Sequence, residues 1–325
     1  MARQTHLTVD VHVTPEDLRA AMVRDVRQGL GADPKSVPPV YFYDEEGSRL
    51  FEAITELPEY YPTRAERALL ERHAPAIAEL AGADTLVELG AGACSKTRVL
   101  LDAMAPDVVR YVPFDVSDDF LRASAAELLA AYDSLEVHAV VGDFHHHLDQ
   151  IPDEGHRLVA FLGSTIGNST PEQRRRFYFD VNCSLGGDDR LLLGTDLVKD
   201  TTRIVAAYDD AAGVTAAFNR NVLRVLNREL GATFDPDAFE HVAAWNAEEE
   251  WIEMRLRSVS DQTVAVDDLD LTVDFGAGEE MLTEISAKFT PERVEKELAE
   301  ADFIVEGMWG ADDGEFLLTL ARPYC

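Results

Sequence analysis

The chain has 325 residues, of which 46% are hydrophobic, so it is long enough for one large domain or two interleaved domains. A formal net charge of −32 would repel nucleic-acid phosphates and anionic membranes, and we expect neither as a partner. No uncharged apolar run reaches the length of a membrane span, and the N-terminus lacks the apolar region of a signal peptide. The acidic composition has two open explanations, a high-GC genome or adaptation to high salt.

The cysteines and histidines favour a reduced, metal-free protein. Cys94, Cys183 and Cys325 form no CxxC pair, and their odd number indicates free thiols and a cytoplasmic location. The run His145-His146-His147 invites a metal site, but three consecutive side chains of a regular element do not converge on one ion. We therefore expect a solvated turn there, and no metal.

The N-terminal part predicts two helices separated by an aromatic stretch. Thr14 followed by Pro15 and two acids predicts a helix start, and apolar residues recur at helical spacing up to Leu30. Pro38-Pro39 ends any helix, and tyrosines and phenylalanines are frequent from 41 to 61. A capping box over 63–66 predicts that the next helix begins there.

From residue 85 to 196 short apolar runs alternate with helical patterns, which predicts a parallel sheet covered on both faces. We expect strands over 85–89, 110–115, 137–141, 158–162 and 190–196. Helices are predicted over 96–104, after Ser117 and after Thr170.

After Asp196 this alternation stops. Helical sequence runs over 201–230, strand-like stretches follow near 251–256, 263–266 and 271–275, and alternation resumes from a helix over 290–301 to strands near 303–309 and 316–321. The simplest architecture is a doubly wound Rossmann-like domain over 64–198 and 289–325. An inserted α+β domain would then comprise 1–63 and 199–288, over the carboxyl ends of the strands, where open α/β sheets bind ligands.

The first three predicted strands each end in residues suited to a nucleoside cofactor. A turn with Gly90 and Gly92 follows the first and allows close backbone approach to a ligand. Asp115 ends the second and could accept both ribose hydroxyls, although a loop or capping role is the alternative. Asp143 and Phe144 end the third and could contact adenine, although a polar loop with a core Phe is equally compatible. Lys96 could reach a methionyl carboxylate or simply be solvated.

Several longer segments resemble a known family, the histidine Nα-methyltransferases of ergothioneine biosynthesis, over about residues 25–320. The resemblance lies in segments 57–64, 87–92, 161–168, 194–200, 208–221 and 279–286. It implies a class I methyltransferase fold with a separate substrate-binding domain. We expect a monomer, although the sequence itself does not give the oligomeric state. It also implies that S-adenosylmethionine donates three methyl groups to the α-amino group of free L-histidine, giving hercynine.

The resemblance also implies roles for particular residues. Those expected to bind the cofactor are Gly90, Lys96, Asp115, Asp143 and Phe144. Those expected to bind histidine are Tyr60, Gly163, Asn168, Tyr208, Met254, Glu284 and Ser286. Tyr43 and Gly163 are expected near the amine, and Tyr43 and Asn168 are the expected catalytic residues. Strand alternation would place Glu284 and Ser286 on one face to hold the imidazole, with Thr283 and Ile285 on the other.

Other functions remain open at this point. A methyltransferase acting on another amino acid or small amine fits the glycine turn and the acids equally well. A nicotinamide oxidoreductase fits less well, because Ser95 stands where a third fingerprint glycine or alanine is wanted. A non-catalytic binding module is disfavoured by the presence of both Asn168 and Tyr208. Cys94 departs from the small non-thiol residues expected in the glycine-rich loop.

Overall fold

The computed structural model describes residues 7–91 and 95–324, which form two compact units. Of these residues, unit 1 holds 7–14, 64–91, 95–197 and 289–324, and unit 2 holds 15–63 and 198–288. The predicted domain bounds coincide with these at 63/64 and 288/289 and differ by one residue at the junction after Leu197. The larger difference lies at the N-terminus, because residues 7–14 belong to unit 1 and not with the inserted segment.

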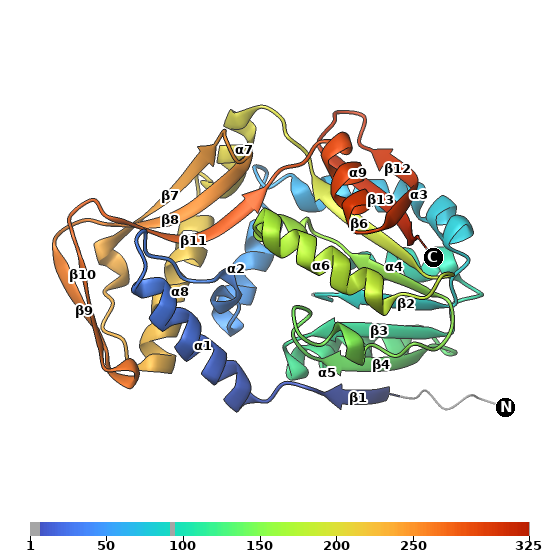
Figure 1. Cartoon of the computed structure of the whole chain (residues 1–325), viewed down its shortest axis with the longest axis horizontal. Coiled ribbons are helices and arrows are strands. Elements are labelled where there is room, and N and C mark those ends of the chain that lie inside the picture. The colour runs from blue at the N-terminus through green and yellow to red at the C-terminus, as the bar shows by residue number, and fades with distance from the viewer. Residues whose placement is uncertain (1–6, 92–94, 325) are drawn as a thin grey trace. The chain divides into compact units, whose positions relative to one another are not determined.

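Unit 1 is built on an eight-stranded sheet with the order β1-β4-β3-β2-β5-β6-β13-β12 (Figure 1). The first six strands in this order are parallel, whereas β13 and β12 are antiparallel to their neighbours. Their bounds are β1 Leu7–Val11, β2 Thr85–Leu89, β3 Arg110–Asp115, β4 Glu136–Val141, β5 Arg157–Phe161, β6 Arg190–Asp196, β12 Phe303–Gly310 and β13 Phe316–Pro323. β1 was not predicted. It adds to the free edge of β4 and thereby draws the N-terminal segment into unit 1.

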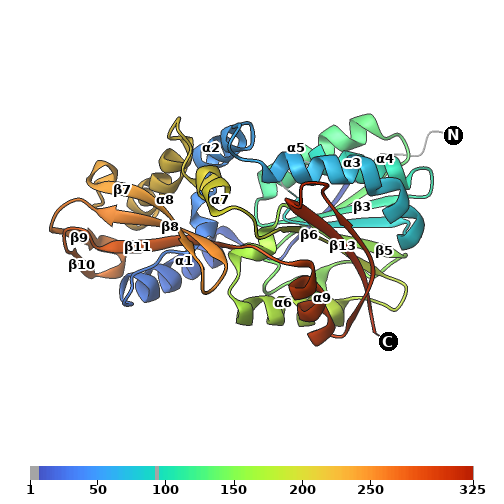
Figure 2. The same ribbon diagram turned by 90° about the horizontal axis from the view of Figure 1, so that it is seen from above.

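Helices cover both faces of this sheet, as the continuous apolar runs of its strands predict. Figure 2 shows α3 (Pro62–Ala81), α4 (Ser95–Met104) and α5 (Asp118–Ala131) on one face. On the other face lie α6 (Pro171–Ser184) and α9 (Pro291–Glu300). Every residue of β2 and β5 is buried. The central strands therefore hold the core, and their loops form the edge of the sheet.

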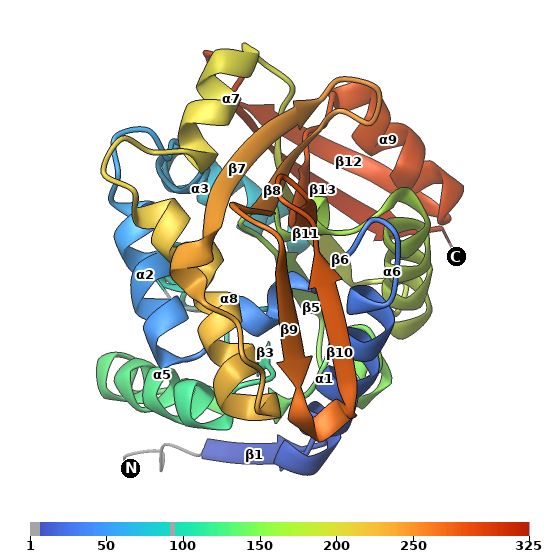
Figure 3. The same ribbon diagram turned by 90° about the vertical axis from the view of Figure 1, so that its left-hand side faces the viewer.

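Unit 2 is an α+β assembly around a three-stranded antiparallel sheet ordered β11-β8-β7, with a separate β9–β10 hairpin (Figure 3). Its strands are β7 Phe239–Asn246, β8 Trp251–Ser258, β9 Gln262–Val266, β10 Leu271–Phe275 and β11 Glu280–Ala287. Its helices are α1 Pro15–Leu30, α2 Glu45–Thr55, α7 Thr201–Tyr208 and α8 Val214–Leu230. Buried side chains of α8, β8 and the aromatic stretch before α2 form one apolar core.

Local signals set most helix ends. Thr170 accepts from the backbone of Gln173 while the Gln173 side chain accepts from Thr170, which completes the capping box at the start of α6. The capping box predicted over 63–66 is wrong, because α3 already begins at Pro62. The helical sequence 201–230 forms two helices, since Gly213 adopts a left-handed φ of 75° before α8.

Candidate functional site

In unit 1 the glycine turn follows β2 as predicted. Gly90 has φ 69°, a conformation that favours glycine, and its N–H donates to the carbonyl of Phe114 at 2.8 Å. A Cβ at this position would meet no atom within 4 Å, so the turn leaves open space beside the backbone. Gly92 and Cys94 lie outside the described residues.

Asp115 and Asp143 come together because β3 and β4 are neighbours. Asp115 pairs with Val141 in the strand register, and the N–H of Gly142 donates to the Asp115 carbonyl at 2.9 Å. Each carboxylate also supports its own loop: Asp115 accepts from the Ser117 N–H at 3.2 Å, and Asp143 from the His145 N–H at 2.8 Å. Both side chains remain partly exposed. Both acids therefore support their loops, and their partial exposure at neighbouring strand ends leaves the predicted binding role open to them.

Phe144 forms an aromatic wall beside these acids. Its ring lies edge-on to Phe161 of β5 at 5.4 Å and to Phe177 of α6 at 5.9 Å between centroids. The residue is only partly buried. It can therefore pack on the core with one side and offer apolar surface to a flat ring with the other.

Lys96 forms an ion pair with Glu66, a residue that the sequence indicated only as part of a helix capping box. The Lys96 ammonium lies 2.5 Å from Oε2 of Glu66, and Oε1 of Glu66 accepts from the N–H of Gly163 at 2.6 Å. Glu66 is fully buried, whereas a quarter of the Lys96 side chain stays exposed. A side chain at Gly194 would place its Cβ 2.2 Å from Glu66 Oε1. Glu66 therefore ties α3 and α4 to the loop after β5 and explains why glycine stands at 194.

The loop after β5 carries Gly163 and Asn168. Gly163 has φ 76°, Ser164 has φ 55°, and Asn168 ends the 3-10 helix η3 (Thr165–Asn168) with its side chain partly exposed. The Ser164 hydroxyl accepts from the N–H of Asp196 at 2.9 Å. A loop with two successive left-handed residues is thus anchored to β6 and to buried Glu66.

In unit 2, β11 carries Glu284 and Ser286, and Met254 of β8 pairs with Glu284 in the register. The strand is irregular between Leu282 and Glu284, where the buried Thr283 donates to the Met254 carbonyl and to the Asn219 side chain. Glu284 is 8% exposed. Burial raises the pKa of Glu284 to about 7, against the opposing charge of Lys288. These residues are therefore buried, unlike those of a half-exposed strand with a polar outer face.

Tyr208, Ser286 and Lys288 form a triangle of polar atoms. The Tyr208 hydroxyl donates to the Ser286 hydroxyl at 2.9 Å, and the Lys288 ammonium lies 2.9 Å from the first oxygen and 3.0 Å from the second. All three side chains are buried, with Lys288 at 0% exposure. Sequence reasoning missed Lys288, although it stands two residues after Ser286 and so shares a face of the extended chain.

The predicted tyrosines of unit 2 are linked through aromatic contacts. Tyr43 lies edge-on to Phe51, Phe51 to Tyr60, and Tyr60 to Tyr208, with centroid distances of 5.7, 6.3 and 6.2 Å. Tyr43 follows the 3-10 helix η1 (Pro39–Phe42), and 46% of the residue is exposed. The aromatic stretch before α3 thus joins the polar triangle in one unit.

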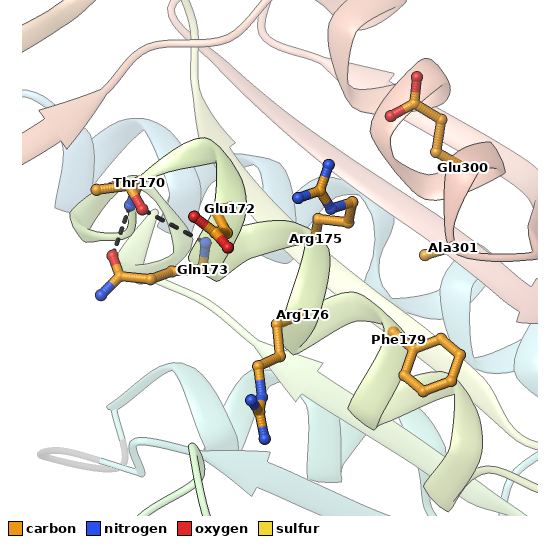
Figure 4. Close-up of a pocket in the computed structure, with 8 residues that line it drawn as sticks. All are labelled: Thr170, Glu172, Gln173, Arg175, Arg176, Phe179, Glu300 and Ala301. Atoms are coloured by element: carbon orange, nitrogen blue, oxygen red, sulfur yellow. Dashed lines mark hydrogen bonds between the residues drawn. The ribbon is translucent and has the colours of Figure 1, made fainter.

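Other candidate features take no part in these two groups. Among residues 7–91 and 95–324, no cluster of three His, Cys, Asp or Glu side chains could hold a metal ion. The same residues include no helix that is long and apolar enough to cross a membrane. A surface pocket beside α6 and the end of α9 contains none of the predicted site residues (Figure 4). It is lined by Thr170, Glu172, Gln173, Arg175, Arg176, Phe179, Glu300 and Ala301.

A parallel sheet with a glycine turn after β2 and acids after β3 and β4 is the arrangement expected of an S-adenosylmethionine-dependent methyltransferase. Comparison with known sequences supports this class, because residues 22–323 match the family of histidine-specific, S-adenosylmethionine-dependent methyltransferases. The chain belongs to this family. The fold class predicted from the sequence and the cofactor class are thereby confirmed.

Individual relatives agree with the family. The chain is 57% identical to the histidine N-alpha-methyltransferase of Mycolicibacterium smegmatis, over 97% of this chain and 99% of that protein. It is 53% identical to the enzyme of the same name from Mycobacterium tuberculosis, with the same coverage. Among solved structures, an S-adenosylmethionine-dependent methyltransferase from Clostridium acetobutylicum has a TM-score of 0.47 and 12% identity, over 85% of this chain and 98% of that one.

Proposed function

We propose that the chain transfers three methyl groups from S-adenosylmethionine to the α-amino group of free L-histidine, giving hercynine for ergothioneine biosynthesis. The observation that carries this proposal is the 57% identity to the histidine N-alpha-methyltransferase of M. smegmatis over nearly the whole of both chains. The buried polar side chains of Glu284 and Ser286 support it, since they suit a ring with nitrogens at two edges.

Unit 1 is the proposed cofactor-binding domain and unit 2 the proposed substrate-binding domain. Asp115 would accept from the ribose hydroxyls, while Asp143 and Phe144 would hold the adenine by a hydrogen bond and by ring packing. Lys96 would face the methionyl carboxylate, and the open space beside Gly90 would let the backbone approach the cofactor closely. The residues fit this cofactor because both acids, although they support loops, are only partly buried at one edge of the sheet.

For the substrate, we assign the imidazole to Glu284, Ser286 and Met254, and the carboxylate to Asn168 and Tyr208. Tyr43, Tyr60 and Gly163 would lie about the amine. The buried ammonium of Lys288 contacts the Tyr208 hydroxyl. Its positive charge would favour binding of the substrate carboxylate near Tyr208.

The bound cofactor would supply a methyl group on a positively charged sulfur. The chain's residues must then present the α-amine as a neutral nucleophile in line with that methyl group, and alignment would supply most of the rate. A second positive charge next to a sulfonium is disfavoured, so the site lowers the pKa of the amine, and a tyrosine or a water molecule suffices as base. Tyrosine faces tolerate the fixed positive charge of the product.

The proposal is tested by incubating the purified chain with S-adenosylmethionine and L-histidine and locating the new methyl groups by NMR. We expect one product with three methyl groups on the α-nitrogen. Methyl groups on a ring nitrogen would contradict it. We also propose a cytoplasmic location, on the strength of the odd number of cysteines. We propose a monomer as well, and light scattering in solution tests it.

A further inference from the structure

The strand β11 contains one residue more than its neighbour β8 at the position of Thr283. The register pairs Leu282 with Arg255 and then Glu284 with Met254. Thr283 is therefore inserted between two successive pairs, and it is only 1% exposed. An inserted residue of this kind is a β-bulge, which re-aims the side chains that follow it.

The bulge decides which face of the sheet Glu284 and Ser286 occupy. Residues directly opposite each other in an antiparallel pair share a face, and a shift of one residue moves every later side chain to the other face. Without the inserted residue, Glu284 would lie opposite Glu253, so that two carboxylates would face each other. With it, Glu284 and Ser286 both lie on the face of Met254.

Two side chains hold the bulge in place. The Thr283 hydroxyl lies 2.7 Å from Oδ1 of Asn219 and 2.9 Å from the Met254 carbonyl, and both of these oxygens accept. The orientation of the Asn219 amide is set by the Arg255 carbonyl, which can only accept and lies 3.1 Å from Nδ2. The same Nδ2 contacts Nδ1 of His241 at 2.8 Å. Asn219 belongs to α8 and is fully buried, so the bulge is tied to the interior of unit 2.

We propose that Thr283 is a specificity-determining positioning residue, which together with Asn219 maintains the bulge that directs Glu284 and Ser286 to the imidazole site. The inference rests on the proposed function, in which these two side chains hold the ring. Selection of histidine then depends on the Thr283 hydroxyl, although that hydroxyl is directed to Asn219 and Met254 and not to the substrate.

The first test compares two matched substitutions. Thr283→Val keeps the shape of the side chain and removes the hydroxyl, whereas Thr283→Ser keeps the hydroxyl. For Thr283→Val we expect kcat/KM for histidine to fall about tenfold through a higher KM, with the KM for S-adenosylmethionine unchanged. The preference for histidine over phenylalanine should fall by the same factor. Thr283→Ser should retain most of both, and Thr272→Val, at an exposed threonine of β10, is the control.

The second test asks whether Thr283 acts through the side chains that hold the ring. In the double variant Glu284→Ala/Ser286→Ala the side chains that the bulge positions are absent. Adding Thr283→Val to this double variant should therefore cause no further loss of kcat/KM for histidine. A purely structural role would lower the efficiency in both backgrounds.

The third test uses the native protein and so does not depend on the folding of a variant. In the perdeuterated protein with S-adenosylhomocysteine and histidine added, backbone nuclear Overhauser effects should place Glu284, and not Thr283, opposite Met254.

The outcomes separate the inference from the function it rests on. The role of Thr283 would be overturned by full efficiency and preference in Thr283→Val, by an equal loss in Thr283→Ser, by a further loss in the double-variant background, or by a regular register in the native protein. In each of these cases methylation of histidine by the native protein would still stand. If the native protein does not methylate histidine, the proposed function fails first, and the inference fails with it.

Discussion

Asp115 is the residue on which cofactor binding should depend most, because its carboxylate lies at the strand end where the ribose is expected. Asp115→Ala should weaken S-adenosylmethionine binding by about 2–3 kcal/mol, since hydrogen bonds to a charged acceptor are lost. Isothermal titration calorimetry measures the change. Asp107→Ala, at an exposed acid before the opposite end of β3, is the control. An unchanged affinity for Asp115→Ala would remove this residue from the cofactor site.

Glu284 should make the stability of the protein depend on pH. Burial raises the pKa of Glu284 to about 7, so the native state keeps a proton that the unfolded chain releases above about 4.5. Glu284 therefore reduces the free energy of unfolding as the pH rises from about 4.5 to 7, and the loss amounts to about 3 kcal/mol.

The variant Glu284→Gln lacks this titration and should gain stability relative to the native protein over the same pH range. Urea unfolding at a series of pH values measures the difference. The exposed Glu295→Gln in α9 serves as the matched control and should follow the native curve. A constant difference between Glu284→Gln and the native protein would mean that Glu284 ionises normally in the folded state.

The sequence predicted which residues lie at strand ends, but it did not predict the side chains that contact the loops around them. Asp115 and Asp143 could be predicted because the end of a parallel strand is a position defined by the chain itself. Glu66 and Lys288, which contact predicted site residues, were not predicted because those partners are distant in sequence: Glu66 contacts Gly163, and Lys288 contacts Tyr208. Such pairs exist only once the fold brings the segments together.

Regular hydrophobic spacing predicted the parallel strands and the long helices. Isolated elements and edge strands were not predicted. The helix α2 lies within an aromatic stretch, yet Asp44 caps it by accepting from the Gly47 N–H at 2.8 Å, and two acids follow Asp44. That capping pattern could have revealed α2. The sequences of β1 and β7 did not predict strands. Most residues of both strands are exposed or only partly buried, so neither strand contains a continuous apolar run. The irregularity at Thr283 could not be predicted from strand alternation.

The start of β5 depends on a buried ion pair that should dominate the stability of this element. Asp189 lies 2.9 Å from Nε of Arg157 and also accepts from the backbone N–H of Arg157, and both side chains are about 5% exposed. Asp189→Ala should reduce the free energy of unfolding by about 3–5 kcal/mol, because it leaves a buried guanidinium without its carboxylate. Urea unfolding tests this, with the adjacent exposed Asp188→Ala as control. A loss below about 1 kcal/mol for Asp189→Ala would show that Arg157 finds other partners.

At the scale of the whole molecule, 61 acidic against 29 basic residues make self-repulsion a general cost of folding. Because added salt screens that repulsion, the Tm should rise from low to moderate NaCl concentration. Thermal unfolding followed by circular dichroism measures it, with an uncharged osmolyte of equal osmolality as control. A flat or falling Tm would favour genome composition over salt adaptation as the origin of the acidic surface.

The central claim is that free histidine is the substrate, and its most direct test is a comparison of kcat/KM over a panel of free amino acids with labelled S-adenosylmethionine. Histidine should exceed phenylalanine and tryptophan by about a hundredfold or more, because a polar ring site rejects apolar rings. Mass spectrometry of the histidine product should find three added methyl groups. A higher kcat/KM for any other amino acid, or no transfer to free amino acids at all, would contradict the account.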